Sequence, residues 1–81
     1  MKAHVWVMPK RTVLDPQGQT IHNALRSLGY SSVKEVRQGK FFVIQLGDMD
    51  LKDATAQLQK ISGEVLTNPV IEEFRFEIVE S

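Results

Sequence analysis

The sequence contains no cysteine and no long apolar run. The lack of cysteine excludes disulfides, thiolate metal sites and cysteine nucleophiles, and it fits a reducing cytoplasm. No apolar run approaches the roughly 20 residues that a helix needs to span a bilayer. The first ten residues are too short and too alternating for a signal peptide. We therefore expect a soluble cytoplasmic protein that is held together by packing alone.

The chain is also short, and its 81 residues predict one domain over residues 1–81. A domain of this size buries only a modest fraction of its surface, so its stability is marginal without further help. We expect self-association, as a dimer or a tetramer, to supply that help.

The charge is balanced overall but uneven along the chain. Residues 1–40 hold seven Lys/Arg against two acids, a charge of +5, whereas residues 41–81 hold three against eight, a charge of −5. Such polarity can orient docking onto a partner, because complementary patches steer encounters and fix register. The alternative is a scatter of charges that folding brings together in space.

The first part of the chain predicts a strand followed by a helix. Residues 3–8 alternate in the period of a strand, and Pro9 ends it because proline cannot donate to a ladder. Asp15 can cap a helix, Pro16 fits the first helical turn, and Gly29 is a typical helix stop. The apolar residues at helical spacing between them are Ile21, Ala24, Leu25 and Leu28.

The middle of the chain predicts a hairpin. Residues 33–37 are a short strand candidate, residues 38–40 a tight turn, and residues 41–46 a strongly β-prone run. The alternative is one long bent strand with a bulge at Gly39.

The last part of the chain predicts a second helix and a final strand. Asp50 can cap this helix, and Asn68-Pro69 ends it. Residues 70–79 then alternate apolar and charged side chains, as a strand with one wet face does. The helical stripe consists of Leu51, Ala54, Leu58, Ile61 and Val65.

The order β-α-β-β-α-β predicts an α+β fold, a ferredoxin-like two-layer sandwich with both helices on one face of an antiparallel sheet. Side chains alternate along a strand, so some large apolar residues must lie on the helix-free face. An exposed apolar patch on a small domain usually marks an interface. We predict dimerisation through this face or edge to edge, with the interface residues Trp6, Met8, Phe41 and Val43.

RNA-recognition motifs share this strand order, and Gly39, Phe42 and Val43 match part of their stacking strand. However, Lys40 and Gln45 stand where stacking aromatics belong. A net charge of zero also removes the attraction to phosphate. A ferredoxin-like RNA-binding or small-ligand regulatory module is thus the alternative function.

No active site is apparent in the sequence. His4 and His22 lie on different predicted elements without a partnered acid, and no glycine-rich phosphate loop is present. Capping and solvated faces account for the clustered carboxylates. We therefore predict no catalytic, cofactor-binding or metal-binding residue in this chain. Arg37 and Lys40 flank Gly39, and they are either an anion or acidic-surface clamp or two solvated turn residues.

Four segments together resemble PurS, the small subunit of bacterial and archaeal phosphoribosylformylglycinamidine (FGAM) synthase. The resemblance covers essentially the whole chain, and Gln38 departs from the family only at a position that the family varies freely. The segments are Leu14-Asp15-Pro16-Gln17-Gly18, Ala24-Leu25-x-x-Leu28-Gly29-Tyr30, Val36-Arg37-x-Gly39-Lys40 and Asn68-Pro69-Val70-Ile71-Glu72.

The resemblance implies a role in de novo purine synthesis. In that complex a glutaminase subunit, PurQ, frees ammonia from glutamine. The synthetase subunit, PurL, binds ATP and Mg and activates the amide oxygen that ammonia displaces. PurS-like chains are dimers that bridge the two larger subunits, support ammonia transfer and contribute no nucleophile.

The resemblance also suggests where partners bind. The loop before the first helix, the turn over residues 37–40 and the join over residues 68–72 would be exposed to the larger subunits. The predicted partner-binding residues are Asp15, Pro16, Gln17, Gly18, Arg37, Gly39, Lys40, Asn68, Pro69 and Glu72.

Overall fold

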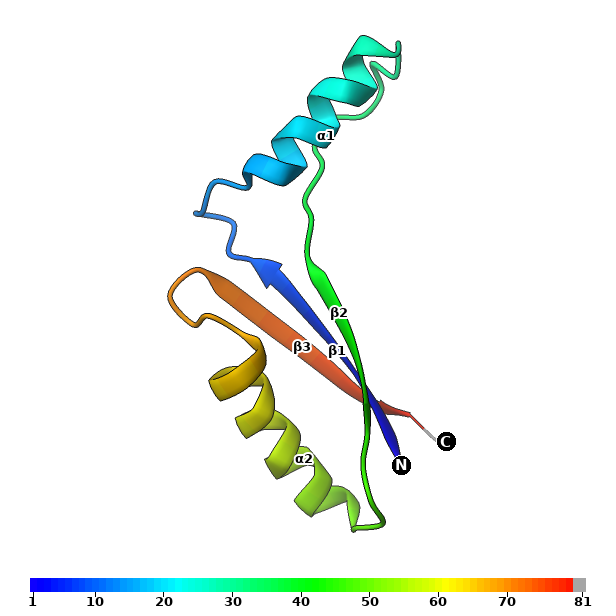
Figure 1. The fold of residues 1–81 in the computed structure, drawn as a ribbon, viewed down its shortest axis with the longest axis vertical. Helices are drawn as coiled ribbons and strands as arrows, with labels where there is room; N and C mark the ends of the chain where they lie inside the picture. Colours follow the sequence, from blue (N-terminus) through cyan, green and yellow to red (C-terminus); the bar gives the residue numbers. More distant parts are fainter. Residues whose placement is uncertain (80–81) are drawn as a thin grey trace.

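A computed structural model describes residues 1–79 as a three-stranded antiparallel sheet with two helices (Figure 1). The strand order is β2-β1-β3, so β1 is central and pairs with both neighbours. The second helix continues into a π-helical turn, η1. The elements are β1 (Lys2–Pro9), α1 (Pro16–Ser27), β2 (Lys40–Gln45), α2 (Leu51–Ile61), η1 (Ser62–Leu66) and β3 (Glu72–Val79).

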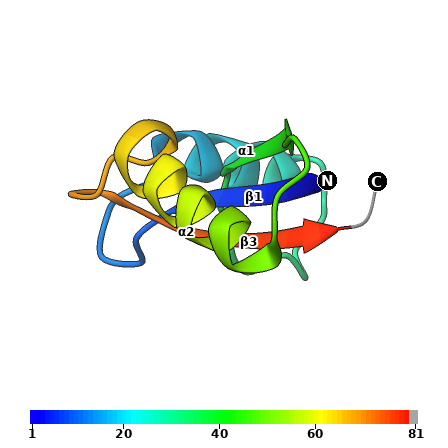
Figure 2. The same cartoon turned by 90° about the horizontal axis from the view of Figure 1, so that it is seen from below.

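The predicted fold class is confirmed, because the antiparallel sheet and two helices form a ferredoxin-like α+β arrangement. Every second residue of β1 is buried on the side that α2 covers, as the period of a strand requires. In Figure 2 α2 lies in front of the strands while α1 lies behind them. The core consists of Ala3, Val5 and Val7 from β1 and Leu58 from α2.

Helix α2 forms where the sequence predicts it. The side chain of Asp50 accepts a hydrogen bond from the backbone N–H of Asp53 at 2.9 Å and so caps the first turn. Ala54 and Leu58, four residues apart, are fully buried against the sheet. The ends of the predicted stripe, Leu51 and Val65, are exposed instead, so the apolar contact is shorter than the pattern indicated.

The predicted strand over residues 33–37 and the tight turn over 38–40 do not form in the described chain. Residues 33–39 lie outside the sheet and run directly into β2, which begins at Lys40 (Figure 1). Two hydrogen bonds hold this segment against the end of β1 and the start of α1, one from Arg37 to the Pro9 carbonyl and one from the Gln38 N–H to Asp15. The alternative, one long bent strand with a bulge at Gly39, does not form either, because β2 begins only at Lys40.

The prediction that both helices cover one face of the sheet is wrong for α1. Figure 1 shows α1 beyond the end of β1, where Ile21 and Leu28 remain 41% and 74% exposed. The radius of gyration is 16.1 Å, against about 12 Å for a compact domain of this length. We call residues 10–39 the arm, and residues 1–9 with 40–79 the body.

Neither helix in the described residues combines the length and the apolar character needed to cross a membrane.

Candidate partner-binding site

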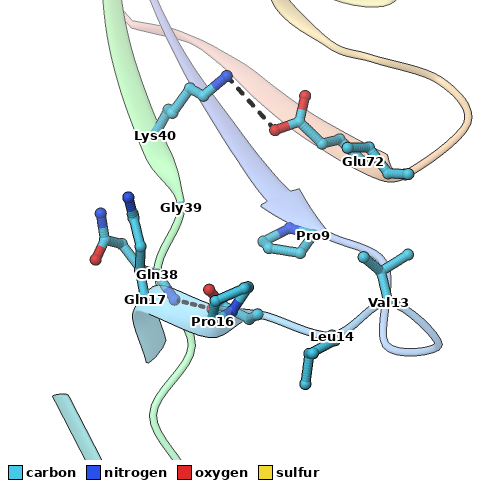
Figure 3. Close-up of a pocket in the computed structure, with 11 residues that line it drawn as sticks. Pro9, Val13, Leu14, Pro16, Gln17, Gln38, Gly39, Lys40 and Glu72 are labelled. Carbon is cyan, nitrogen blue, oxygen red and sulfur yellow. Dashed lines mark hydrogen bonds and ion pairs between the residues drawn. The ribbon is translucent and has the colours of Figure 1, made fainter. Parts of the chain in front are cut away.

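Most of the predicted partner-binding residues meet where the arm joins the body. The loop before α1, the chain entering β2 and the join before β3 line one open pocket of about 410 Å³ (Figure 3). The predicted residues in its lining are Asp15, Pro16, Gln17, Gly39, Lys40 and Glu72. Three segments that are far apart in sequence thus form one surface.

Asp15 ties two of these segments together. Its Oδ1 accepts the Gly18 N–H at 3.0 Å, which caps α1 as predicted, and its Oδ2 accepts the Gln38 N–H at 2.8 Å. The Gln38 N–H, followed by the Gly18 N–H, lowers the pKa of the Asp15 carboxyl because both hydrogen bonds favour the charged form. The carboxylate therefore fixes the start of α1 against the chain that enters β2.

Gly18 and Gly39 are needed for close backbone contacts. A Cβ at the buried Gly18 would collide with the Val36 carbonyl oxygen and with the Asp15 carboxylate. A Cβ at Gly39 would collide with the Val7 carbonyl oxygen and with Met8. Gly18 therefore lets α1 approach the segment that enters β2, and Gly39 lets that segment approach β1, since any side chain would force the backbones apart.

Arg37 and Lys40 do not form a joint clamp. Arg37, whose side chain is only 21% exposed, donates to the Pro9 carbonyl and places Nε 3.9 Å from the Glu35 carboxylate. Lys40 instead extends across the pocket to Glu72, with Nζ 3.5 Å from Oε2 (Figure 3). Arg37 therefore has a bracing role inside the chain, and Lys40 is the cation that is exposed at the pocket.

The join before β3 is stiffened by its own hydrogen bonds. The Asn68 N–H donates to Glu72 Oε1 at 2.8 Å, and the Val70 N–H donates to Asn68 Oδ1 at 3.1 Å. Lys10 of the arm donates through Nζ to the Pro69 carbonyl at 2.8 Å. This join thus presents a fixed shape, with the apolar side chain of Val70 exposed at its tip.

Sequence reasoning missed the apolar part of this pocket. Val13, Leu14 and Ile71 also line it, and Leu14 and Ile71 are exposed. Leu14 and Ile71 stand inside the segments that carry the family resemblance, so a signal was available there. The bonds that Lys10 and Gln38 make had no such signal, because they depend on contacts distant in sequence.

The predicted interface residues Trp6, Met8, Phe41 and Val43 do lie on the face of the sheet opposite α2. The pairing places Trp6 opposite Phe41 on one side and opposite Arg75 on the other. The Trp6 and Phe41 ring centroids are 5.5 Å apart, and the Arg75 guanidinium carbon is 4.1 Å from the Trp6 ring centroid. This aromatic and cationic patch is exposed, with Phe41 at 52%.

The histidines are engaged in local contacts. His4 packs edge-on against Trp6 and Phe41, and His22 Nε2 lies 3.0 Å from the Val33 carbonyl oxygen within the arm. Among residues 1–79, no three His, Cys, Asp or Glu side chains come together in a way that could hold a metal ion.

The fold and the pocket define a small ferredoxin-like α+β protein whose exposed loops and apolar surfaces are of the kind that other chains bind. Three comparisons identify its family.

The PurS family model, described as phosphoribosylformylglycinamidine (FGAM) synthase, matches residues 2–80. The PurS subunit of Bacillus subtilis is 37% identical over 79 residues, which cover 98% of this chain and 93% of that protein. The PurS subunit of Mycobacterium leprae is 41% identical over 73 residues, or 90% of this chain and 89% of that one. A chain in the solved structure of PurLQS from Thermotoga maritima has a TM-score of 0.87 at 31% identity, covering 96% and 95% of the two chains.

The chain therefore belongs to the PurS family of FGAM synthase, as the four sequence segments predicted.

Proposed function

We propose that this chain is the small subunit of an FGAM synthase in de novo purine biosynthesis, and that it bridges the synthetase subunit PurL and the glutaminase subunit PurQ. The observation that carries the proposal is a match to PurS proteins over nearly the whole chain, including a chain of a PurLQS structure. The complex would work in the cytoplasm, and ATP and Mg would bind to the synthetase subunit. The chain itself would add contacts and no reacting group.

The pocket between arm and body is the surface that we assign to the larger subunits. Its apolar lining includes Leu14 and Ile71, and Lys40 and Glu72 stand beside them as a charged pair. Apolar contact of this kind supplies affinity, whereas charges at the rim set orientation and register. Because internal hydrogen bonds already hold the surrounding loops, docking there costs little conformational entropy.

Bridging would bring the glutaminase close to the synthetase and so support ammonia transfer. A defect in this role should reduce synthesis with glutamine more than synthesis with free ammonia, because only the first requires the two subunits to be coupled.

The test is co-elution of the chain with purified PurL and PurQ on a sizing column, followed by activity of the reconstituted complex. Lys40→Glu places two acids side by side at the pocket, because Glu72 is its neighbour. We expect it to weaken co-elution and to lower glutamine-dependent synthesis about tenfold, as the loss of about 1.4 kcal/mol of binding would do. Its fold should survive, since an exposed ion pair contributes only about 0–1 kcal/mol.

Lys52→Glu is the matched control, because Lys52 is an exposed lysine on α2, away from the pocket. If the two variants reduced co-elution and glutamine-dependent synthesis equally, the pocket would not be the surface that binds the larger subunits. Binding to single-stranded RNA that weakens steeply with salt, without co-elution, would favour the RNA-binding alternative.

A further inference from the structure

The outer edge of β3 is unpaired in the described chain. β3 pairs with β1 on one side, and no strand of residues 1–79 pairs with its other side. Figure 2 shows β3 as the outermost strand, with α2 in front of the sheet. An edge strand of this kind offers its free N–H and C=O groups to a further strand.

The pairing with β1 determines which backbone groups of β3 are free. In an antiparallel pair, every second pair of opposite residues exchanges both backbone hydrogen bonds. The Lys10 N–H donates to the Ile71 carbonyl at 2.8 Å, just beyond the last paired residues, and this bond fixes which pairs are the bonded ones. The residues of β3 that bond to β1 in the middle of the strand are therefore Glu73, Arg75 and Glu77.

The residues between them present the free groups. The N–H and C=O groups of Phe74, Phe76 and Ile78 point away from β1, and none of them makes a hydrogen bond within residues 1–79. The strand is also regular, since its register with β1 runs from Glu72 to Val79 without a bulge. Proline, lysine and bulges are common devices that keep an edge from pairing, and residues 72–79 contain none of them. The edge is therefore open to a further strand.

The charged side chains beside this edge specify what such a strand would carry. Opposite residues of paired strands point to the same face and interact directly. On the face opposite α2, the acids Glu73 and Glu77 are exposed, and neither has an ion-pair partner within residues 1–79. Arg75 between them is held over Trp6, 4.1 Å from the ring centroid. A strand that pairs here would place Lys or Arg opposite both acids, four residues apart.

The other face of the same edge is apolar. Phe74, Phe76 and Ile78 pack against the core but are only partly buried, and no strand of residues 1–79 lies beyond them. An added strand would cover them with apolar side chains between its two basic residues. The edge thus fits an extended segment that is basic at its first and fifth positions and apolar at its second and fourth.

A second copy of this chain does not supply such a segment. No two of its ten Lys/Arg residues are four positions apart in the sequence. The basic segment that complements Glu73 and Glu77 therefore belongs to a different protein.

We propose that the edge of β3 binds a basic extended segment of one of the two larger subunits by adding it to the sheet, and that the pocket holds the other subunit. This inference rests on the proposed function, because a bridge between two proteins needs two surfaces. The pocket lies at Ile71 and Glu72, and the free backbone groups extend to Ile78, about 20 Å along the strand from Glu72. In this mode of binding, main-chain hydrogen bonds supply affinity and the side chains supply specificity.

The first experiment is hydrogen exchange in the isolated chain and in its complex with PurL and PurQ, read at single amides by NMR after quenching. In the isolated chain, the amides of Phe74, Phe76 and Ile78 should exchange at least about tenfold faster than those of Arg75 and Glu77, which are bonded to β1. In the complex their exchange should slow about a hundredfold. Protection that is already present in the isolated chain, or absent from the complex, would overturn the proposal.

The second experiment measures the binding of variants to PurL and to PurQ separately. Glu77→Lys puts a lysine opposite a basic residue of the added strand, and it should weaken the binding of one subunit about tenfold. Lys40→Glu, at the pocket, should weaken the binding of the other. Asp48→Lys is the matched control, because Asp48 is an exposed acid in the loop after β2 and undergoes the same change of charge. It should leave both affinities unchanged.

The outcomes separate this inference from the proposed function. If Glu77→Lys and Lys40→Glu weaken the same subunit, or if Glu77→Lys acts no more strongly than Asp48→Lys, the edge of β3 is not the second surface. A wild-type chain that binds neither subunit would instead refute the proposed function. The fold should survive Glu77→Lys because the side chain is exposed, and unchanged protection of the Arg75 amide checks this.

Discussion

The body and the arm are held in place by different forces. In the body, Val5, Val7 and Leu58 are fully buried against one another, and burial of apolar area supplies the stability. In the arm, α1 buries only Gly18. Its direction is set by the hydrogen bond that Asp15 accepts from the Gln38 N–H and by the one that Arg37 donates to the Pro9 carbonyl. Packing determines that the body folds, whereas polar contacts determine where the arm points.

This difference matters because hydrogen bonds and apolar contacts respond to different changes. Loss of a buried methyl group leaves a cavity in the core and lowers the free energy of unfolding. Loss of a hydrogen bond at the arm should leave the body folded and release the arm. The following predictions test that separation.

The largest effect should come from the core. Leu58→Ala should lower the free energy of unfolding by about 2–5 kcal/mol, because it leaves a cavity beneath α2. Leu28→Ala is the matched change in the arm, where the side chain is exposed, and it should cost less than about 0.5 kcal/mol in a dissociated chain. Urea unfolding at several protein concentrations measures both. If the decrease in the free energy of unfolding grows with protein concentration for Leu28→Ala alone, Leu28 contacts another copy of the chain. Equal decreases for the two variants would show that the arm depends on apolar packing as much as the body does.

A smaller effect on stability is expected at Gly39, where the arm meets the body. Gly39→Ala should cost about 1–3 kcal/mol, because the new methyl group meets the Val7 carbonyl and must push the arm away from β1. Gly47→Ala has open space around its Cβ and should change the stability by less than about 1 kcal/mol. Thermal unfolding of the two variants is the measurement, and a neutral Gly39→Ala would mean that the close approach is relaxed in solution.

The smallest effect should be the dependence of the Asp15 hydrogen bonds on pH. Hydrogen bonds lower the folded pKa of Asp15, so its contribution is complete above the unfolded pKa of about 3.9 and is lost as the pH falls through the folded pKa. Hydrogen exchange should therefore show the Gly18 and Gln38 amides losing protection in acid, while amides of β1 keep theirs. In Asp15→Asn this change with pH should disappear. If it persists, another group governs the junction.

Much of the body could be predicted from the sequence. The alternation in β1 and β3, the cap at Asp50 and the spacing of Ala54 and Leu58 are local patterns, and local patterns determine which face of an element is buried. Asp15 was likewise predicted as a cap from its place before Pro16. Its second hydrogen bond, to Gln38, joins residues 23 positions apart and left no local trace.

The sequence by itself determined β1, β2, β3, the two helices and the family of this protein, because these follow from periodicity, capping and motif spacing. The tertiary structure alone decided that residues 33–37 leave the sheet, that α1 lies beyond it, and that three distant loops form one pocket. The physical reason is that a strand or an amphipathic helix specifies which of its faces needs a partner. Which partner it meets depends on contacts across the whole chain, at Gly39, Asp15 and Arg37.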